Sequence, residues 1–250
     1  MKVSIVTAVV DRADTIAQAV KSVQRQSHRE LEHVIQDGGS QDGTLEIVER
    51  LADNRINLVS EPDHGIYDAI NRGIARSTGD VVGLLHSDDF FAHEEVVARI
   101  AAAFENPEVE AVYGDLDYVS SSDPDRVVRR WRAGAFSQSM LRRGWMPPHP
   151  TLYLRASVFR DYGNYDTSFE IAADYDAILR YFGAAQVRSV YLREVLIKMR
   201  LGGASNASLV HILKKSKEDL RALRRNDIGG YGALALKNIS KIGQFVLKGK

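Results

Sequence analysis

Acidic side chains follow three strand-like segments in the first hundred residues, and side chains of this type bind cations and polar ligands. Asp37 follows LEHVIQ, Glu61 and Asp63 follow INLV and its serine, and Asp88 and Asp89 come just after the apolar run VVGLL. The carboxyl ends of parallel strands meet at one edge of a sheet, where α/β proteins bind ligands. Carboxylates crowded there repel one another unless a cation or a hydrogen-bonding ligand lies between them. The pattern therefore predicts a divalent cation held by one or two carboxylates and by the phosphates of a substrate.

Each cluster taken alone also has an ordinary structural explanation. Asp after a strand commonly caps a helix or closes a turn, and Asp-Gly pairs such as the one that begins at Asp37 are typical of turns. Asp88 and Asp89 fit this explanation least, because a helix N-terminus needs one capping side chain and not two charges. The coincidence of three clusters, with Arg72 nearby, favours a ligand site.

The elements that must position these acids alternate between strand and helix patterns. Strands are predicted at residues 3–7, 31–36, 56–59 and 81–85, and helices at 14–26, 43–52, 67–76 and 94–104. Strand and helix alternating through short links predict an α/β fold, with a mostly parallel central sheet flanked by helices. A continuous apolar strand such as VVGLL belongs at the centre of that sheet.

The pattern changes after residue 108. Short strands are predicted at 109–113, 117–119 and 127–131, a loop-rich stretch at 134–150, a helix at 175–182 and a strand at 187–191. We therefore expect one domain over residues 1–204, with a first half at 1–108 and a second half at 109–204, followed by a basic helical C-terminal tail at 205–250.

Composition narrows the class of protein. Of the 250 residues, 44% are apolar and 26% are charged, as expected of a globular protein with a sizeable core. The chain has no cysteine, which excludes disulfides, thiolate zinc sites and cysteine nucleophiles and suits a reducing cytoplasm. The first apolar stretch is only about seven residues long, so we expect it to be a strand and not a signal peptide.

Charge is unevenly distributed, although the net charge is zero. Residues 205–250 carry ten Lys or Arg against three Asp or Glu. Apolar side chains recur there at helical spacing, which is typical of a helix that lies on an anionic membrane surface. A helix packed on its own domain with a solvated charged face gives the same pattern. No apolar stretch there is long enough to span a membrane, and outside this tail the chain has no basic and aromatic platform for nucleic acid.

Four runs of sequence, in this order and spacing, resemble one known family: SIVTAVVDRADTIAQAVKSVQRQ, VIQDGGSQDGT, SEPDHGIYDAINRGI and GDVVGLLHSDD. They look like the nucleotide-sugar domain of family 2 glycosyltransferases, over residues 2 to about 203. The resemblance implies the GT-A nucleotide-diphospho-sugar transferase fold, with a nucleotide-sugar half at 1–108 and an acceptor half at 109–204. The segment GIYDAINRGI especially resembles bacterial enzymes of surface-polysaccharide assembly.

The resemblance implies a donor site for a nucleoside-diphosphate sugar, a UDP-sugar foremost. Thr7 and Asp37 correspond to the positions that hold the base and the ribose, and Asp63 and Arg72 to residues that line the base and the diphosphate. Many relatives have two acids where this chain has Asp37 followed by Gly38. Recognition of the base is therefore expected to be looser or different here.

Asp88 and Asp89 match the Asp-x-Asp-type signature of the family. The match implies that Asp89 binds Mn²⁺ or Mg²⁺ and that Asp88 contacts the ribose or the donor sugar. His149, in PPHPTLYLRASVF, lies in a stretch that resembles the acceptor side and is a candidate metal or acceptor contact, although a lone loop histidine more often serves neither purpose. We expect His86 and His93 to be incidental.

The catalytic base of the family is an acid that follows the metal pair at a distance along the chain. In FEIAADYDAILRY the best match is Asp174, with Asp176 as its competitor, and the position before Asp174 is Ala173 where relatives have a second acid. Asp174 also suits the N-cap of the predicted helix. Arg200, in MRLGGASN, resembles the segment that folds over the diphosphate, and its two glycines suit a plain hinge equally well.

The sequence thus predicts an inverting, metal-dependent glycosyltransferase that moves a sugar from a nucleoside-diphosphate donor to a lipid-linked or polysaccharide acceptor. The expected setting is bacterial exopolysaccharide, capsule or O-antigen biosynthesis in the cytoplasm, with peripheral attachment to the inner face of the plasma membrane through the tail. A nucleotidyltransferase is one alternative, but it would need a Gly-rich phosphate loop, and TAVVDRADT has no glycine. A non-catalytic sugar-nucleotide-binding membrane scaffold is the other, and the presence of Asp174 argues against it.

Overall fold

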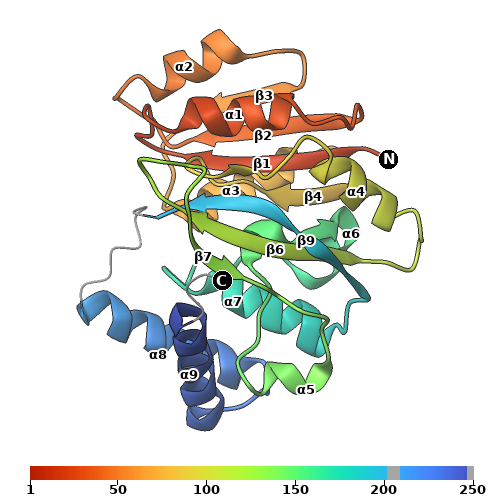
Figure 1. The fold of residues 1–250 in the computed structure, drawn as a ribbon, viewed down its shortest axis with the longest axis vertical. Coiled ribbons are helices and arrows are strands. Elements are labelled where there is room, and N and C mark those ends of the chain that lie inside the picture. Colours follow the sequence, from red (N-terminus) through yellow and green to blue (C-terminus); the bar gives the residue numbers. More distant parts are fainter. Residues whose placement is uncertain (202–208, 247–250) are drawn as a thin grey trace.

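The computed structural model describes residues 1–201 and 209–246. Within these residues the chain forms one nine-stranded sheet with the order β3-β2-β1-β4-β8-β6-β9-β5, and β7 pairs with β6 beside this path (Figure 1). The strands are β1 (Val3–Val9), β2 (Leu31–Asp37), β3 (Ile56–Ser60), β4 (Val81–Leu84), β5 (Phe90–Phe91), β6 (Ala111–Val119), β7 (Val127–Trp131), β8 (Tyr153–Arg155) and β9 (Ser189–Arg200).

The first four strands of the chain, β1 to β4, are parallel. β1 lies between β2 and β4, with Val3 opposite Leu31 on one side and Val81 on the other. β3 extends this group on the outer side of β2. The carboxyl ends of these strands therefore meet at one edge of the sheet, which confirms the fold predicted from the alternating strand and helix patterns.

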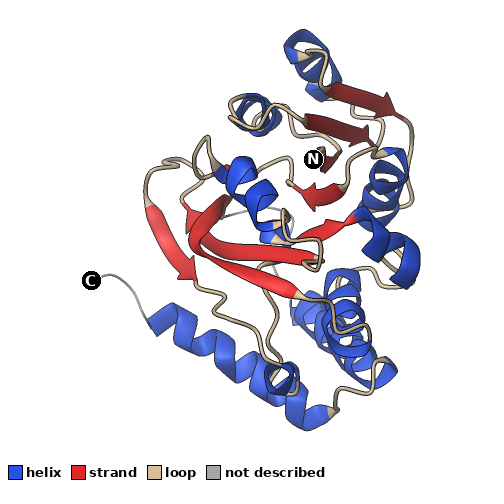
Figure 2. Cartoon of the chain, turned by 90° about the vertical axis from the view of Figure 1, so that its right-hand side faces the viewer, coloured by secondary structure: helices blue, strands red, loops and turns tan. Residues whose placement is uncertain are grey.

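Helices cover both faces of the sheet (Figure 2). Val3 and Ile5 of β1 pack with residues of α1 and α4, whereas Val6 packs with residues of α3, because successive side chains of a strand point to opposite faces. The helices are α1 (Ile16–Gln24), α2 (Thr44–Leu51), α3 (Ile66–Arg76), α4 (Val96–Ala103), α5 (Gln138–Leu141), α6 (Ala156–Tyr162), α7 (Ala173–Ile178), α8 (Leu209–Arg225) and α9 (Tyr231–Val246), with a 3₁₀ turn at His149–Thr151.

The C-terminal half adds antiparallel strands and makes the sheet mixed. β8 runs antiparallel to β4 and β6, whereas β9 runs parallel to β6. β6 is one strand where we expected two short ones, because its pairing with β9 continues across register shifts at Asp115. β9 extends to Arg200, well past the predicted end at residue 191, because its alternating charged and apolar residues pair with both β6 and β5.

The helix predicted at residues 175–182 begins earlier and changes its winding. α7 covers Ala173–Ile178 and continues as a π-helical turn over Leu179–Ala184. The N-cap of α7 is Ala172, so the expectation that Asp174 caps this helix is wrong. Asp174 lies instead within the first turn, where its side chain is available for contacts with other elements.

α8 and α9 lie against α7 at one end of the molecule (Figure 1). Ala222 and Leu223 of α8 are fully buried in the core cluster that contains Tyr175 and Phe182. The described part of the tail thus packs on the domain, and none of the described helices is long and apolar enough to cross a membrane. The Gly-Gly of the MRLGGASN run lies outside the described residues, as does the boundary between the predicted domain and tail, which stays a prediction.

The pH dependence of stability should reflect the buried His33. Its Nε2 lies 2.9 Å from the Thr7 hydroxyl, and burial lowers the pKa of His33 to about 3. The unfolded chain then binds one more proton than the folded chain once the pH falls below about 6.5. We expect this residue to reduce the free energy of unfolding by up to about 1.4 kcal/mol per pH unit between about pH 6 and pH 4.

Urea unfolding at several pH values measures this contribution. His33→Gln should flatten the loss of stability on acidification, whereas His64→Gln, which alters an exposed histidine, should keep the wild-type slope. Equal slopes in wild type and His33→Gln would contradict the expectation.

Candidate active site

Asp89 is a buried carboxylate at the carboxyl end of β4. Its side chain is 0% exposed, and its Oδ1 accepts a hydrogen bond from the backbone N–H of Arg200 at 3.3 Å. Its Oδ2 has no hydrogen-bond partner among the described residues. Burial, reinforced by the neighbouring Asp88, raises the pKa of Asp89 well above its usual range. A buried oxygen without a partner is costly, so this atom is suited to a ligand that the protein alone does not supply.

Arg200 approaches the same place from the end of β9. Its Nη1 donates to the backbone carbonyl oxygen of Asp88 at 2.6 Å, and its Nη2 contacts Gln18 of α1. Its guanidinium carbon lies 5.1 Å from the centre of the Phe90 ring. Three elements far apart in sequence thus hold Arg200 beside the two aspartates, and its guanidinium is a cation suited to a diphosphate.

The residues at this edge fit a divalent cation bound together with a substrate. Among residues 1–201 and 209–246, no group of three or more His, Asp or Glu side chains could hold a metal ion by itself. Mg²⁺ and similar hard ions are commonly held by one or two carboxylates, with waters and substrate phosphates as the other ligands. The unpartnered Oδ2 of Asp89, with Asp88 next to it, provides that smaller set of protein ligands.

A second polar group surrounds Asp174. His149, on the 3₁₀ turn, places its Nδ1 3.4 Å from Oδ2 of Asp174. The other ring nitrogen of His149 lies 2.8 Å from Nε2 of His86. Tyr67 of α3 donates its hydroxyl to the backbone oxygen of Ile171 at 2.7 Å and lies 3.3 Å from Oδ1 of Asp174. The carboxylate is therefore contacted on both oxygens.

The electrostatics of this group keep Asp174 ionised. Burial alone would raise its pKa, but a protonated His149 and the tail cations Lys215 and Lys237 outweigh that effect, and the pKa of Asp174 lies below its usual value. Burial lowers the pKa of His149 and lowers that of His86 to about 3, so at neutral pH both imidazoles are neutral and the two lysines supply the positive charge near Asp174. Asp174 is therefore ionised at neutral pH and can accept a proton.

The contact between the two histidines constrains where their protons lie. One of the two facing Nε2 atoms must donate and the other must accept, because a neutral imidazole has one nitrogen of each kind. A proton on Nδ1 of His149 faces Asp174 and leaves Nε2 of His149 to accept from His86. Because both ring nitrogens of His149 then have protein partners, a metal role for His149 would require it to release His86; that role stays a prediction.

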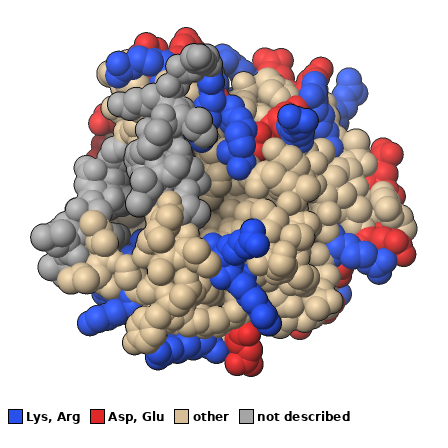
Figure 3. Space-filling model, turned by 60° about the horizontal axis from the view of Figure 1, so that its bottom comes forward, with Lys and Arg blue, Asp and Glu red and all other residues tan. Residues whose placement is uncertain are grey.

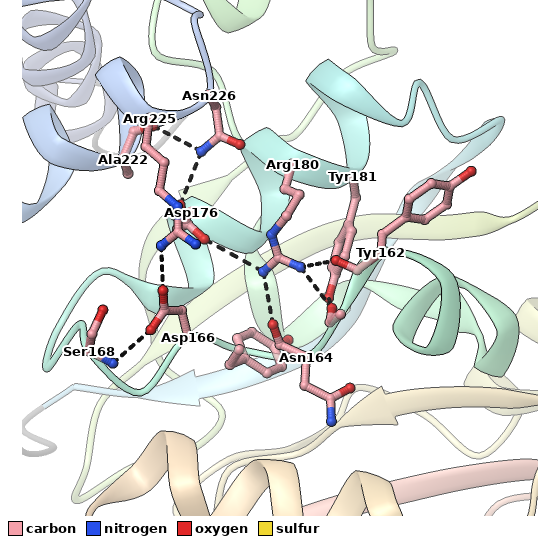
Figure 4. Close-up of polar contacts among 12 residues, drawn as sticks. Tyr162, Asn164, Asp166, Ser168, Asp176, Arg180, Tyr181, Ala222, Arg225 and Asn226 are labelled. Atoms are coloured by element: carbon pink, nitrogen blue, oxygen red, sulfur yellow. Dashed lines mark hydrogen bonds and ion pairs between the residues drawn. The ribbon is translucent and has the colours of Figure 1, made fainter.

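Asp176, the predicted competitor of Asp174, is directed elsewhere. Its side chain is 1% exposed, accepts a hydrogen bond from Asn226 Nδ2 at 3.0 Å, and lies 3.5 Å from the Arg180 guanidinium (Figure 4). Asp174 and Asp176 are two residues apart on a helix, so they do not share a face. The geometry therefore separates the two acids that the sequence left as alternatives.

Thr7 and Asp37 are buried, and their side chains are used within the protein. The Thr7 hydroxyl donates to the backbone oxygen of Leu85 at 2.8 Å. The carboxylate of Asp37 accepts from the N–H groups of Gly39 and Ser40 and from the Ser60 hydroxyl. The contacts of Asp37 fix the loop after β2, and the donor-binding roles of Thr7 and Asp37 stay predictions.

Asp63 and Arg72 lie on the loop after β3 and on α3. Asp63 accepts from the N–H of Gly65 at 2.8 Å and lies so close to Gly38 that an added Cβ there would be 2.5 Å from its Oδ2. Gly38, the departure from the acid pair of relatives, thus makes room for Asp63. Arg72 pairs with Asp68 at 2.9 Å, and its side chain is 32% exposed. The nucleotide roles of these residues stay predictions.

The structure thus brings the predicted residues together in groups. Asp88, Asp89 and Arg200 form one, and His149 and Asp174 form another. His86, expected to be incidental, and Tyr67, which the sequence did not single out, both belong to the second group. Little in the sequence indicated that these two residues belong to the site. His86 comes directly after the central strand, but its contact with His149 spans 63 residues.

Two solved structures share this fold. The crystal structure of S. aureus TarS 1-349 in complex with UDP-GlcNAc superimposes with a TM-score of 0.68 at 16% identity, over 90% of this chain and 65% of that one. The mannosyltransferase PcManGT from Pyrobaculum calidifontis, in complex with GDP-Man and Mn²⁺, also gives a TM-score of 0.68, at 17% identity, over 100% of this chain and 76% of that one. This chain spans a little less than two thirds of the TarS fragment. The fold is that of the GT-A glycosyltransferases.

The sequence relatives define the family. A family model described as Glycosyl transferase family 2 matches residues 4–164 of the chain. An uncharacterized glycosyltransferase of Mycobacterium tuberculosis (strain CDC 1551 / Oshkosh) is 32% identical over 209 residues, 82% of this chain and 77% of that protein. A PGL/p-HBAD biosynthesis glycosyltransferase of Mycobacterium bovis (strain BCG / Pasteur 1173P2) is 31% identical over 208 residues, 81% and 78% of the two chains. The chain belongs to glycosyltransferase family 2 and is a glycosyltransferase.

Replacement of Asp89 should increase the stability of the metal-free protein and remove its response to a cation. Asp89→Asn removes a buried carboxylate whose Oδ2 has no hydrogen-bond partner among the described residues, so in metal-free buffer the variant should unfold with a free energy about 1–3 kcal/mol higher than wild type at pH 7. Mn²⁺ should raise the midpoint of thermal unfolding of the wild type but not of the variant. Differential scanning calorimetry with Mn²⁺ and with EDTA measures both effects.

Asp88→Asn is the control, because its partly exposed side chain carries no comparable burial and its backbone contact with Arg200 survives the change. Its stability should stay close to that of the wild type. An equal Mn²⁺ response in wild type and Asp89→Asn would show that the cation binds elsewhere.

Proposed function

We propose that this enzyme is an inverting, metal-dependent glycosyltransferase that moves a sugar from a nucleoside-diphosphate donor to a lipid-linked or polysaccharide acceptor. The observation that carries the proposal is the contrast between two buried carboxylates. Oδ2 of Asp89 has no hydrogen-bond partner among the described residues, and the pKa of Asp89 is raised, whereas Asp174 is held by His149 and Tyr67 and has a lowered pKa. The first suits a cation site, and the second is ionised at neutral pH and so can accept a proton.

The transfer is a single displacement at the anomeric carbon. The acceptor hydroxyl oxygen forms a bond to that carbon, and the bond from the carbon to the diphosphate oxygen breaks with its electron pair on the diphosphate. The proton of the acceptor hydroxyl passes to Asp174, whose orientation His149 and Tyr67 maintain. A bound Mn²⁺ or Mg²⁺ would supply positive charge for the leaving diphosphate, and Arg200 adds to it from the protein. Attack opposite the leaving group inverts the configuration.

We assign the donor to the edge formed by the ends of β1, β2, β3 and β4. The loops fixed by Asp37 and Asp63 would hold the base and ribose, and Asp88 would contact the ribose or the sugar. Solved relatives were crystallised with UDP-GlcNAc and with GDP-Man, which supports a nucleoside-diphosphate sugar as the donor class. A UDP-sugar is our first choice.

The setting we propose is the assembly of a bacterial exopolysaccharide, capsule or O-antigen at the cytoplasmic side of the plasma membrane. The relative from Mycobacterium bovis, named for PGL/p-HBAD biosynthesis, supports a role in building a cell glycoconjugate.

Donor binding and turnover test the assignment together. Isothermal titration with UDP-, GDP- and TDP-sugars, with Mn²⁺ and then with EDTA, should find metal-dependent binding of one nucleotide class. Asp174→Asn should bind that donor with unchanged affinity and lose about 10²- to 10⁴-fold in turnover, because the proton acceptor is removed. Turnover is followed as release of nucleoside diphosphate.

Asp176→Asn is the matched control, since its side chain points toward Arg180 and Asn226 and not toward His149. Wild-type turnover in Asp174→Asn would place the base elsewhere. Binding of a donor without any turnover by the wild type would favour a binding scaffold.

We further propose that the tail attaches the enzyme to the membrane surface. The tail helices expose large apolar side chains among basic ones, and Figure 3 shows this end of the molecule, where Lys and Arg lie around broad uncharged areas. The exposed apolar residues are Ile212, Leu213, Tyr231, Leu236 and Ile239. Apolar side chains in a basic setting suit an anionic lipid surface.

Sedimentation with lipid vesicles tests this attachment. The protein should sediment with vesicles that contain phosphatidylglycerol, less with phosphatidylcholine alone, and less again as salt is raised. Leu213→Glu, at a position 64% exposed, should weaken sedimentation severalfold, whereas Ile66→Glu, on α3 at 48% exposure, should not. Equal sedimentation with both lipids, or no effect of Leu213→Glu, would count against the proposal.

A further inference from the structure

Glu218 of α8 is bound to the loop that leads into α7. Its carboxylate accepts hydrogen bonds from three consecutive backbone N–H groups, those of Glu170 at 3.2 Å, Ile171 at 2.8 Å and Ala172 at 2.9 Å. These contacts span 46 to 48 residues of sequence. A single side chain of the tail therefore holds three successive backbone groups directly before α7, in which Asp174 is the second residue.

The local sequence offers no side chain of its own to hold the chain here. A helix start is commonly fixed by a Ser, Thr, Asp or Asn at the N-cap. The N-cap of α7 is Ala172, which has no such side chain, and Glu218 binds its N–H and those of the two residues before it. Ile171 also presents its backbone oxygen to Tyr67, which contacts Asp174. The loop held by Glu218 thus carries both the candidate base and the anchor of the hydroxyl beside it.

Further contacts attach α8 to both sides of this loop. Arg221 donates to the Ser168 hydroxyl at 2.7 Å, and Arg225 pairs with Asp166. Figure 4 shows Arg225 next to Asp166, with Asn226 at Asp176. The pairs of Arg221 and Arg225 involve exposed or partly exposed side chains, so each contributes little by itself. Arg221 also reaches one backbone oxygen, that of Ser168. Glu218 differs because it binds three consecutive backbone N–H groups and so fixes the path of the chain.

A buried ion pair holds α8 to α9 and to α7. Lys237 of α9 lies 2.7 Å from Asp219, and its ammonium is 3.0 Å from the centre of the Tyr175 ring. Lys237 is 1% exposed and Asp219 is 2% exposed. Asp219 and Tyr175 are the direct neighbours of Glu218 and Asp174 in the chain. The ion pair therefore anchors α8, which carries Glu218, next to the turn of α7 that carries Asp174.

We propose that Glu218 is a positioning residue for the proton-accepting carboxylate of Asp174. The inference rests on the proposed function, because it takes Asp174 as the base. Glu218 holds the backbone of residues 170–172 and thereby sets where the first turn of α7 places that carboxylate. The basic tail is then part of the catalytic machinery as well as a surface element.

The test is a comparison of binding and turnover in Glu218 variants of the full chain. The probe is the donor found by titration, with Mn²⁺, and turnover is the release of nucleoside diphosphate with water as the acceptor. Glu218→Ala should lower kcat about 10- to 100-fold, the size of effect that a misplacement of about 1 Å produces. Its donor affinity and its binding stoichiometry should stay at the wild-type values. Glu218→Gln keeps a carbonyl oxygen for the amides and should recover most of the lost turnover.

Glu170→Gln is the matched control. It breaks an exposed ion pair between the same loop and Lys214 of α8 but leaves the three N–H contacts in place, so its kcat should equal that of the wild type. Wild-type kcat in Glu218→Ala, or a loss fully explained by reduced binding stoichiometry, would overturn the positioning role. Asp174→Asn is measured in parallel: if it is inactive while Glu218→Ala is normal, only the positioning role fails, and if it stays active, the base assignment and the positioning role fail together.

Discussion

The burial of the Asp89 carboxylate is the constraint around which this edge of the sheet is built. Its Oδ1 has a backbone partner and its Oδ2 has none in the part of the chain that the structure describes, in surroundings that disfavour its charge. A buried oxygen without a hydrogen-bond partner is tolerated in a fold when a ligand from outside the chain binds it. Arg200, brought by the long strand β9, donates from its side chain to the backbone oxygen of Asp88 and from its backbone N–H to the Asp89 carboxylate, so that the two halves of the chain meet at this point. The mixed pairing of β6, β8 and β9 thus places Arg200 beside Asp88 and Asp89.

The two carboxylates show how one edge of a sheet supports two kinds of chemistry. Asp89 is surrounded by apolar strand ends and another acid, whereas Asp174 faces His149 and cations from the tail. Their pKa values are therefore displaced in opposite directions, and groups whose environments separate their pKa values in this way can divide the roles of ligand and base. The neutral histidine pair next to Asp174 adds hydrogen-bonding groups without adding charge.

The basic tail also pairs with acidic side chains of the domain. Asp166, Glu170 and Asp176 all lie on the segment around α7. The first two are paired with basic residues of α8, and Asp176 is paired with Asn226, directly after that helix. The uneven charge of the chain is thus partly neutralised within the molecule. The remaining exposed apolar and basic side chains of the same helices face outward, so that one short segment can act on the candidate base and on a surface at the same time.

Particular residues show how much of the fold and of the candidate site could be predicted from the sequence. The alternation of strands and helices up to residue 108, the central place of VVGLL and the gathering of acids at one edge followed from local periodicity, because burial repeats every two residues in a strand and about every 3.6 in a helix. The family resemblance followed from motifs of adjacent residues, such as Asp88 with Asp89. The sequence favoured Asp174 over Asp176 only through the family resemblance, because both have the same type and nearly the same position.

Only the tertiary structure shows that the two acids have different partners, since it directs one toward His149 and the other toward Arg180 and Asn226. It also brought His86 to His149 and Glu218 to the amides before α7, contacts between residues 46 or more positions apart that leave no periodic trace in the sequence. Local pattern determines which face of an element is buried, but contacts between side chains of distant elements depend on how all the elements pack together. For that reason the sequence by itself determined the fold and the edge at which the site lies, and packing decided which side chains meet there.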